Sequence, residues 1–408
     1  MTAAPIPCAP NILTRLSHKG AAVTTNLLQT GWSDLDSAEL RFILLERIGK
    51  PGQYDGRDSN PNEFYLPLAG ASCRIKLTFS DSKQIVAIEP GLAFDAVAWQ
   101  QVIEEIEKAG SHKVGRDCSF STFRVAGSWR GERSGVQILP PPADAPRAPV
   151  EIAEHPFILE FPVKGSDLWS ITNFRRMREH RKLTLLLNVL LAGGTTIQPR
   201  RPRHLWAIVH EEGVADQEVK WVQEFYFAKL GEVVRDELSS PSAQALEEVD
   251  PESYYATGGH DGRGLRVPAD LDDSICRYTR LSKANRCKID RAGFWMDMAS
   301  RQWTVSFSAS FASLVIGIES LGERNSGATA RFRNFIERYA PSASLDSRRK
   351  EMYSLRSDIL HGSRLLEMDQ DAHFGWAPPE QKERDLMDEL WGLTRIAMRN
   401  WLTNIDPV

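Results

Sequence analysis

The clearest fold signal lies in residues 307–321, which read FSASFASLVIGIESL. Large apolar side chains recur there every three or four positions, as on one face of an α-helix. They are Phe307, Phe311, Leu314, Val315, Ile318 and Leu321. The spacing predicts a buried helix, and the serines interleaved with these residues argue against a membrane span.

Two further stripes of the same spacing follow. The first consists of Phe332, Phe335, Ile336 and Tyr339, and the second of Leu386, Leu390, Leu393, Thr394, Ala397 and Trp401. The alternation typical of strands is missing from about Leu271 onward. We therefore predict that residues 270–405 form an all-α helix bundle.

The preceding part of the chain mixes alternating and helical patterns. The predicted strands are 64–68, 73–79, 84–88, 120–129, 135–139, 157–162, 205–209 and 219–227, and the predicted helices are 35–48, 95–109 and a run that ends at 191. Five prolines between 140 and 149 indicate a linker. We predict an α+β protein with small antiparallel sheets in a 1–150 domain, a middle region 151–265 that is separate or continuous with it, and the 270–405 bundle.

The composition is that of an ordinary globular protein. The 408 residues include 50 Lys+Arg and 54 Asp+Glu, for a net charge of −4, which leaves room only for local basic patches. The five cysteines are scattered and form no Cys-x-x-Cys pair, so a disulfide framework and a zinc ribbon are not indicated. Residues 1–11 lack the pattern of a secretion signal. We expect a cytoplasmic protein without a membrane segment.

The helix predicted from Leu345 to His361 carries an anomaly. Its apolar stripe is Leu345, Met352, Leu355, Ile359 and Leu360. Arg356 falls within this stripe and so points inward or into an interface, where a guanidinium requires a carboxylate partner or an anionic ligand. His361 follows five residues later, about 140° around an ideal helix, and Gly362 is a typical helix cap. The two side chains meet on one phosphate only if the last turn unwinds or if two chains pool their residues.

At this point the residues match a family. The string Tyr353-Ser354-Leu355-Arg356-Ser357-Asp358-Ile359-Leu360-His361-Gly362 resembles the Arg-Ser-x-x-x-His-Gly signature of HEPN domains, in particular of the ApeA-like branch. The segment Ile318-Glu319-Ser320-Leu321 is similar to the acidic helix of the same branch. The resemblance covers about residues 270–405.

The resemblance implies a metal-independent endoribonuclease that works as a homodimer through this bundle, without a cofactor. Arg356 and His361 would be catalytic, and Glu319, Ser357 and Tyr353 would support them; Glu319 could orient Arg356 or be a solvated boundary residue. The residue types suit RNA cleavage by its own 2′-OH, because histidine transfers protons near neutral pH and arginine binds phosphoryl oxygens. A defence or toxin role would follow, with an N-terminal region that senses an unidentified trigger.

The alternatives remain open. The bundle could be a catalytically inactive HEPN-type domain that binds RNA or pairs protomers, or Arg356 could be a structural arginine. The Asp369-x-Asp371-x-His373 pattern has no second ligand cluster, so we do not expect a metal there.

Two basic patches are candidates for RNA contact. The first is Arg348, Arg349 and Lys350, shortly before Arg356, together with Arg331, Arg333 and Arg338 on the preceding helix. The second lies between Ile171 and Trp206, with seven arginines and one lysine against Glu179 alone, and it includes Arg175, Arg176 and Arg178. Such patches attract a phosphate backbone. The second patch could equally bind a nucleic-acid trigger, contact an acidic loop of the same chain, or be a solvated helix face.

Overall fold

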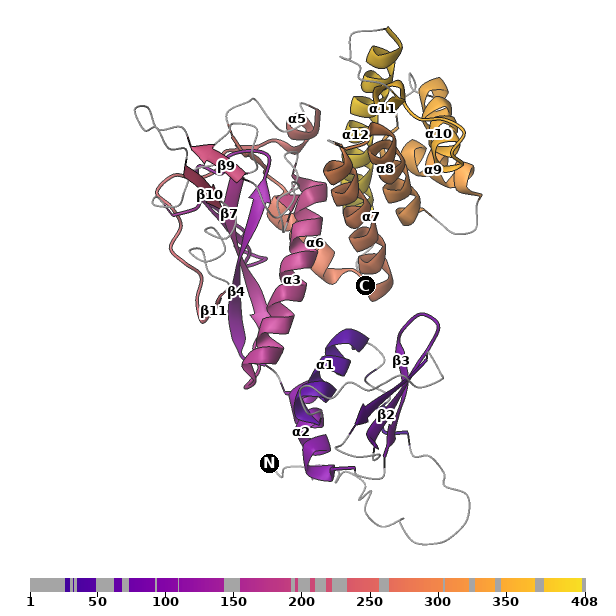
Figure 1. Ribbon diagram of the computed structural model, residues 1–408. Helices are drawn as coiled ribbons and strands as arrows, with labels where there is room; N and C mark the ends of the chain where they lie inside the picture. Colours follow the sequence, from indigo (N-terminus) through magenta and orange to yellow (C-terminus); the bar gives the residue numbers. More distant parts are fainter. Residues whose placement is uncertain are drawn as a thin grey trace, which may run out of the picture. The chain divides into compact units, whose positions relative to one another are not determined.

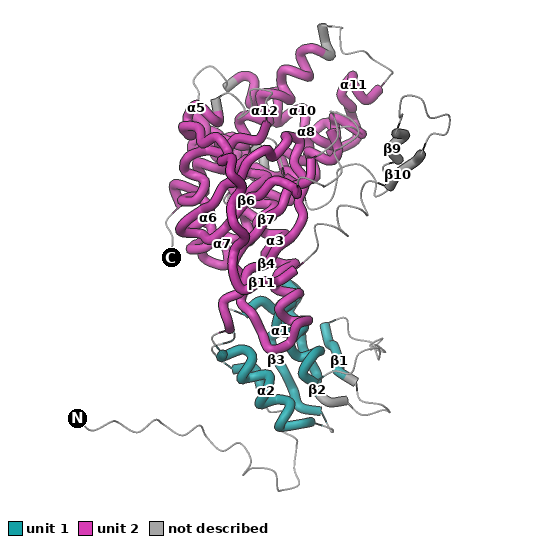
Figure 2. Tube along the Cα trace, turned by 90° about the vertical axis from the view of Figure 1, so that its left-hand side faces the viewer, with its two compact units in different colours: residues 1–108 teal, residues 109–408 magenta. Residues whose placement is uncertain are grey.

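The structure is a computed structural model (Figure 1). The structure describes residues 26–29, 32, 35–48, 62–67, 73–91, 94–108, 110–142, 155–191, 195–196, 206–209, 218–221, 233–256, 264–303, 305–322, 327–341, 346–370 and 378–405. The chain forms two compact units, Met1–Lys108 and Ala109–Val408, coloured separately in Figure 2. Each unit is described by itself.

Unit 1 combines a three-stranded antiparallel sheet with two helices. Its elements are α1 (Ser37–Arg47), β1 (Glu63–Pro67), β2 (Cys73–Phe79), β3 (Ile85–Pro90) and α2 (Ala96–Glu107), and the strand order is β1-β2-β3. Asp36 and Asp95 begin the two helices, because each carboxylate accepts backbone N–H bonds of the first turn. The predicted strands and helices of this unit are confirmed.

Unit 2 begins with a larger sheet. Its strands are β4 (His112–Ser121), β5 (Trp129–Arg130), β6 (Gln137–Leu139), β7 (His155–Lys164), β8 (Thr195–Thr196) and β11 (Val233–Arg235). The strand order is β11-β4-β7-β6-β5, and β8 also pairs with β4. The strand predicted over 120–129 is wrong except at its two ends. Ser121 Oγ accepts the Phe123 N–H, and residues 122–127 bend away between β4 and β5.

The pairing of β4 with β7 moves the domain boundary. The two strands run antiparallel from His112 opposite Lys164 to Ser121 opposite His155. They flank the proline-rich segment in the sequence, so that segment connects parts of one sheet. The boundary between the compact units therefore lies at Lys108 and not near residue 150.

One long helix, α3 (Trp169–Leu190), packs on this sheet, as Figure 1 shows. The smaller elements that follow are β9 (Trp206–Val209), β10 (Glu218–Trp221), β12 (Glu248–Val249), α5 (Pro251–Ala256) and β13 (Val267–Pro268). Strands β9 and β10 pair antiparallel, with Trp206 opposite Trp221, which confirms the predicted hairpin over these residues.

The remainder of unit 2 is helical, which confirms the α+β class. The helices are α6 (Leu271–Arg280), α7 (Lys283–Gln302), α8 (Phe307–Leu321), α9 (Ala328–Tyr339), α10 (Asp346–Leu360), α11 (Glu367–Gln370) and α12 (Pro378–Asn404). Phe161 of β7, Leu187 of α3 and Phe311 of α8 belong to one hydrophobic core. The predicted bundle therefore shares its interior with the sheet. No helix within the described ranges has the length and apolar content of a membrane span.

Candidate functional site

Helix α10 ends as the sequence predicts. Gly362 has a φ of +70°, in the left-handed region that glycine adopts readily. The Gly362 N–H donates to the Ile359 carbonyl at 3.0 Å, and the His361 N–H donates to the Ser357 carbonyl at 3.0 Å. These bonds satisfy carbonyls of the last helical turn. They fix the backbone of His361 just beyond the end of the helix.

Arg356 is held by a carboxylate of a neighbouring helix. Its guanidinium donates to Glu319 Oε2 of α8 at 2.7 Å. The Arg356 side chain is 16% exposed and that of Glu319 is 10% exposed. Burial raises the pKa of the Glu319 carboxyl, and the nearby guanidinium groups of Arg356 and Arg331 oppose this effect. The predicted contact between Glu319 and Arg356 is confirmed, whereas its part in catalysis stays a prediction.

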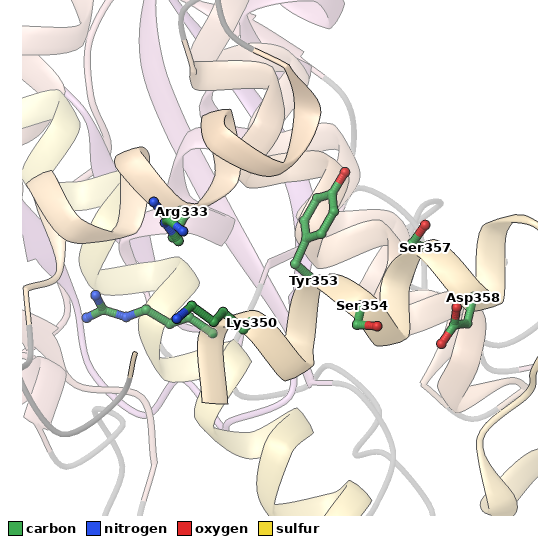
Figure 3. A pocket seen from close by; sticks show the side chains of 7 residues that line it. Arg333, Lys350, Tyr353, Ser354, Ser357 and Asp358 are labelled. Carbon is green, nitrogen blue, oxygen red and sulfur yellow. The ribbon is translucent and has the colours of Figure 1, made fainter. Parts of the chain in front are cut away.

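Tyr353 and Ser357, four positions apart, lie on one face of α10. The Arg356 guanidinium lies 5.8 Å from the centre of the Tyr353 ring, within the range of a cation–π contact. Tyr353 also packs on Phe332 of α9. Both Tyr353 and Ser357 line a pocket, whose close-up is Figure 3.

The pocket lies along the solvent side of α10. Its volume is about 340 Å³, and its lining residues are Arg333, Arg349, Lys350, Tyr353, Ser354, Ser357 and Asp358. Three of these side chains are cationic and one is a carboxylate. Such a pocket can hold a group that carries negative charge, such as a phosphate.

Arg356 and His361 do not line this pocket, and the structure does not bring them together in one chain. The Arg356 guanidinium turns toward α8, while His361 is exposed after the helix end. Leu360 and Leu365, on either side of His361, are 47% and 48% exposed. His361 therefore lies in a surface segment between two exposed leucines.

The first basic patch divides into three environments. Arg348 pairs with Glu389 of α12 at 2.7 Å. Arg349 is buried and donates to the Ala340 carbonyl at 3.1 Å, so it reaches a ligand only through the pocket wall. Lys350 is exposed and also lines the pocket. Only part of this patch is therefore open to a polynucleotide.

The second patch requires a correction. Arg175 and Arg176 are buried, so the prediction that they contact RNA is wrong. Arg175 donates to the carbonyls of Lys164 and Gly165, and Arg176 forms an ion pair with Asp117 of β4. The helix packs on the sheet through the side that carries them. Arg178 remains half-buried over the Phe174 ring and pairs with Glu179. Arg200, Arg201 and Arg203 lie outside the described residues.

Around Arg176 lies a polar network that the sequence analysis missed. Ser119 Oγ and His180 Nε2 are 2.7 Å apart, and His180 Nδ1 lies 3.6 Å from Asp117 Oδ2. Burial, together with the Arg176 charge, lowers the pKa of His180 to about 3. The order Ser-His-Asp is that of a catalytic triad, but Ser119 is fully buried and no substrate can reach it. The network holds α3 on the sheet.

A signal for this network was present in the sequence. Asp117 and Ser119 are two positions apart on β4, while Arg176, His180 and Thr184 are four apart on α3. The first spacing selects one face of a strand and the second one face of a helix. Polar residues in both patterns could have predicted a buried contact between the two elements.

Asp369 has a structural role. It accepts hydrogen bonds from Ser306 Oγ and from the backbone N–H groups of Phe307 and Ser308, at the start of α8. Burial raises its pKa, but these bonds lower it further and the net shift is downward. Asp371 and His373 fall outside the described residues. Across the part of the chain that is described, no group of three or more His, Cys, Asp or Glu side chains is arranged to hold a metal ion.

No protein-family model matches the chain, and neither a curated protein nor a solved structure matches it.

Proposed function

We propose that this protein is a metal-independent endoribonuclease of the HEPN type. The observation that carries the proposal is the Arg356–Glu319 pair, at 2.7 Å, beside a pocket lined by three cationic side chains. A guanidinium oriented by a carboxylate and placed at a cationic surface is suited to an RNA phosphodiester. The resemblance of residues 353–362 to the HEPN signature supports the same chemistry.

The reaction is an attack of the ribose 2′-OH on its own 3′-phosphate. A general base takes the proton of the 2′-OH, and a general acid protonates the 5′-oxygen that leaves. His361 supplies proton transfer, and Arg356 donates hydrogen bonds to the phosphoryl oxygens as negative charge grows on them. The products are a 2′,3′-cyclic phosphate and a 5′-hydroxyl. DNA lacks the 2′-OH and is not cleaved.

The active unit is a homodimer. Within one chain Arg356 faces Glu319 while His361 is exposed beyond Gly362. Two chains that bring their α10 helices together would place both pairs in a shared cleft. The exposed Leu360 and Leu365 beside His361 support this arrangement, because an interface would remove them from water.

We assign to the N-terminal part of the chain the sensing of a trigger and the restraint of the nuclease, within an antiviral-defence or toxin system in the cytoplasm. The support is the division into two units, with the site residues confined to residues 319–361 of unit 2.

The test is cleavage of total RNA by the full chain in EDTA. We expect cleavage without added metal, and a loss of about 100-fold or more in Arg356→Ala and in His361→Ala. Arg384→Ala is the matched control, since Arg384 is an exposed arginine of α12 outside the site. Circular dichroism verifies that each variant is folded. Folded Arg356→Ala and His361→Ala proteins that cut RNA at the parental rate would overturn the proposal.

One observation favours a second candidate. The Arg356 guanidinium is already engaged with Glu319, and no described contact brings His361 to it. This is the arrangement expected of an inactive HEPN-type domain that binds RNA or pairs protomers. In the same assay, this second candidate predicts that the protein binds RNA and leaves it intact.

A further inference from the structure

The pocket beside α10 has two chemically different ends. Arg333 and Lys350 lie at one end and Asp358 at the other, with the Tyr353 ring between them (Figure 3). The buried Arg349 is a third cationic residue in the pocket lining. A ligand that fits both ends carries negative charge at one side and hydrogen-bond donors at the other.

The size of the pocket fits a single nucleotide. Its volume of about 340 Å³ falls at the lower end of the range for small-ligand pockets, roughly 300–1,000 Å³. Lys350 and Asp358 are eight positions apart, which corresponds to about 12 Å along a helix. This length accommodates one nucleotide from its phosphate to the edge of its base. The Tyr353 side chain provides an aromatic surface for the sugar or the base.

Of the described residues that line the pocket, Asp358 is the only acidic one. Among the described residues its carboxylate has no hydrogen bond or ion pair, while its backbone carbonyl accepts from Ser363. A carboxylate accepts two parallel N–H bonds. Guanine presents its N1–H and its exocyclic amine side by side, whereas the other bases place an acceptor beside a donor on that edge. An acceptor lone pair facing the carboxylate is repelled, so guanine is preferred.

We propose that this pocket binds one nucleotide of an RNA strand next to the cleaved phosphodiester, and that Asp358 selects guanine there. The inference rests on the proposed function and names a specificity-determining residue for it. Tyr353 connects the two sites, because its ring lines the pocket and lies 5.8 Å from the Arg356 guanidinium. The nucleotide in the pocket would therefore set which phosphodiester reaches Arg356.

The experiment measures binding separately from cleavage. Guanosine, adenosine, cytidine and uridine 3′-monophosphates are titrated into the full chain by calorimetry. We expect the guanosine nucleotide to bind about 10-fold more tightly than the uridine nucleotide, as for one bidentate base contact. Asp358→Asn should reduce this ratio to about twofold or less. Lys350→Ala should weaken all four nucleotides alike, because it removes a phosphate contact.

The control is Asp385→Asn, a change of an exposed aspartate on α12 outside the pocket, which should leave the ratio unchanged. Equal affinity for the four nucleotides, or a guanine preference that survives Asp358→Asn, would overturn the proposal. A short guanine-containing RNA should bind more tightly than the free nucleotide; a free nucleotide that binds more tightly would overturn the assignment to an RNA strand.

Mapping of the cleavage positions separates the two proposals. Cleavage next to guanine in the parent, and at all four bases in Asp358→Asn, is the result we expect. Cleavage without any base preference would overturn the pocket assignment and leave the nuclease in place. Guanine-selective binding without cleavage would leave the nucleotide pocket in place and overturn the nuclease.

Discussion

Two arginine–carboxylate pairs of unit 2 have similar composition but differ in their access to a ligand. Arg176 pairs with Asp117 where α3 meets β4, and their side chains are 1% and 5% exposed. Arg356 pairs with Glu319 where α10 meets α8, with exposures of 16% and 10%. The first pair is sealed, whereas the second borders a pocket through Tyr353. An arginine on an inward helix face therefore indicates a partner, and its neighbours decide whether a ligand can reach it.

The energetic consequences of the two pairs also differ. A sealed ion pair has lost the hydration of both charges, so removal of one partner leaves the other charge buried and unpaired. A pair that water reaches is less sensitive, because the remaining charge can be solvated. The next three predictions test this difference, from the largest expected effect to the smallest.

The largest effect is expected from Asp117→Asn. It leaves the Arg176 guanidinium charged in the interior, at a cost of about 3–5 kcal/mol in the free energy of unfolding. Urea unfolding followed by circular dichroism measures this change. The control is Asp236→Asn, which removes an exposed carboxylate paired with Lys113 and should change stability by less than about 0.5 kcal/mol. Equal effects of the two substitutions would show that burial does not distinguish these pairs.

His180 makes the sealed region sensitive to acid. Its pKa of about 3 lies below the 6.5 of an unfolded histidine, so only the unfolded chain takes up this proton between the two values. Stability from His180 is therefore complete above pH 6.5 and is lost as the pH falls toward 3. Between pH 7 and pH 4 the loss is about 3 kcal/mol. His180→Asn should remove this part of the pH dependence of the urea midpoint, and an unchanged dependence would contradict the prediction.

The smallest of the three effects is expected at the less deeply buried pair of Arg356 and Glu319. Glu319→Gln should lower the free energy of unfolding by about 1–2 kcal/mol, because solvent and the neighbouring Tyr353 ring partly compensate Arg356. The rate of RNA cleavage should fall by more than the loss of folded protein explains, since the guanidinium loses its orientation. Glu337→Gln, in an exposed pair with Arg333, is the control for stability. A loss in the free energy of unfolding as large as that of Asp117→Asn would contradict the predicted difference between the two pairs.

Much of the fold followed from local patterns. The strand predicted over 73–79 has the bounds of β2, and the helix predicted over 345–361 lies within one residue of α10 at either end. The Asp95 carboxylate caps the start of α2, and Gly362 ends α10 because glycine adopts a positive φ readily. The domain boundary was misplaced, because a proline-rich segment looks the same between two domains and between two strands of one sheet.

The site was predictable in part. The HEPN resemblance predicts that Glu319 orients Arg356, which agrees with their observed contact, and the apolar stripe of α10 predicts the inward position of Arg356. The sequence groups Arg333 with Arg348, Arg349 and Lys350 as one basic patch, but it does not show how α9 packs on α10 to form the pocket. The burial of Arg175 and Arg176 was missed because a basic run was counted by charge and not by helix face.

The order of helices and strands, their caps and the inward position of Arg356 are written in the sequence, because each depends on residues a few positions apart. The sequence does not determine whether a cation is sealed in the interior or lies beside a pocket. Asp117 and Arg176 are 59 positions apart, and Glu319 and Arg356 are 37 apart. Only the packing of distant elements decides how much water remains at each pair, and that amount sets both its energy and its access to a ligand.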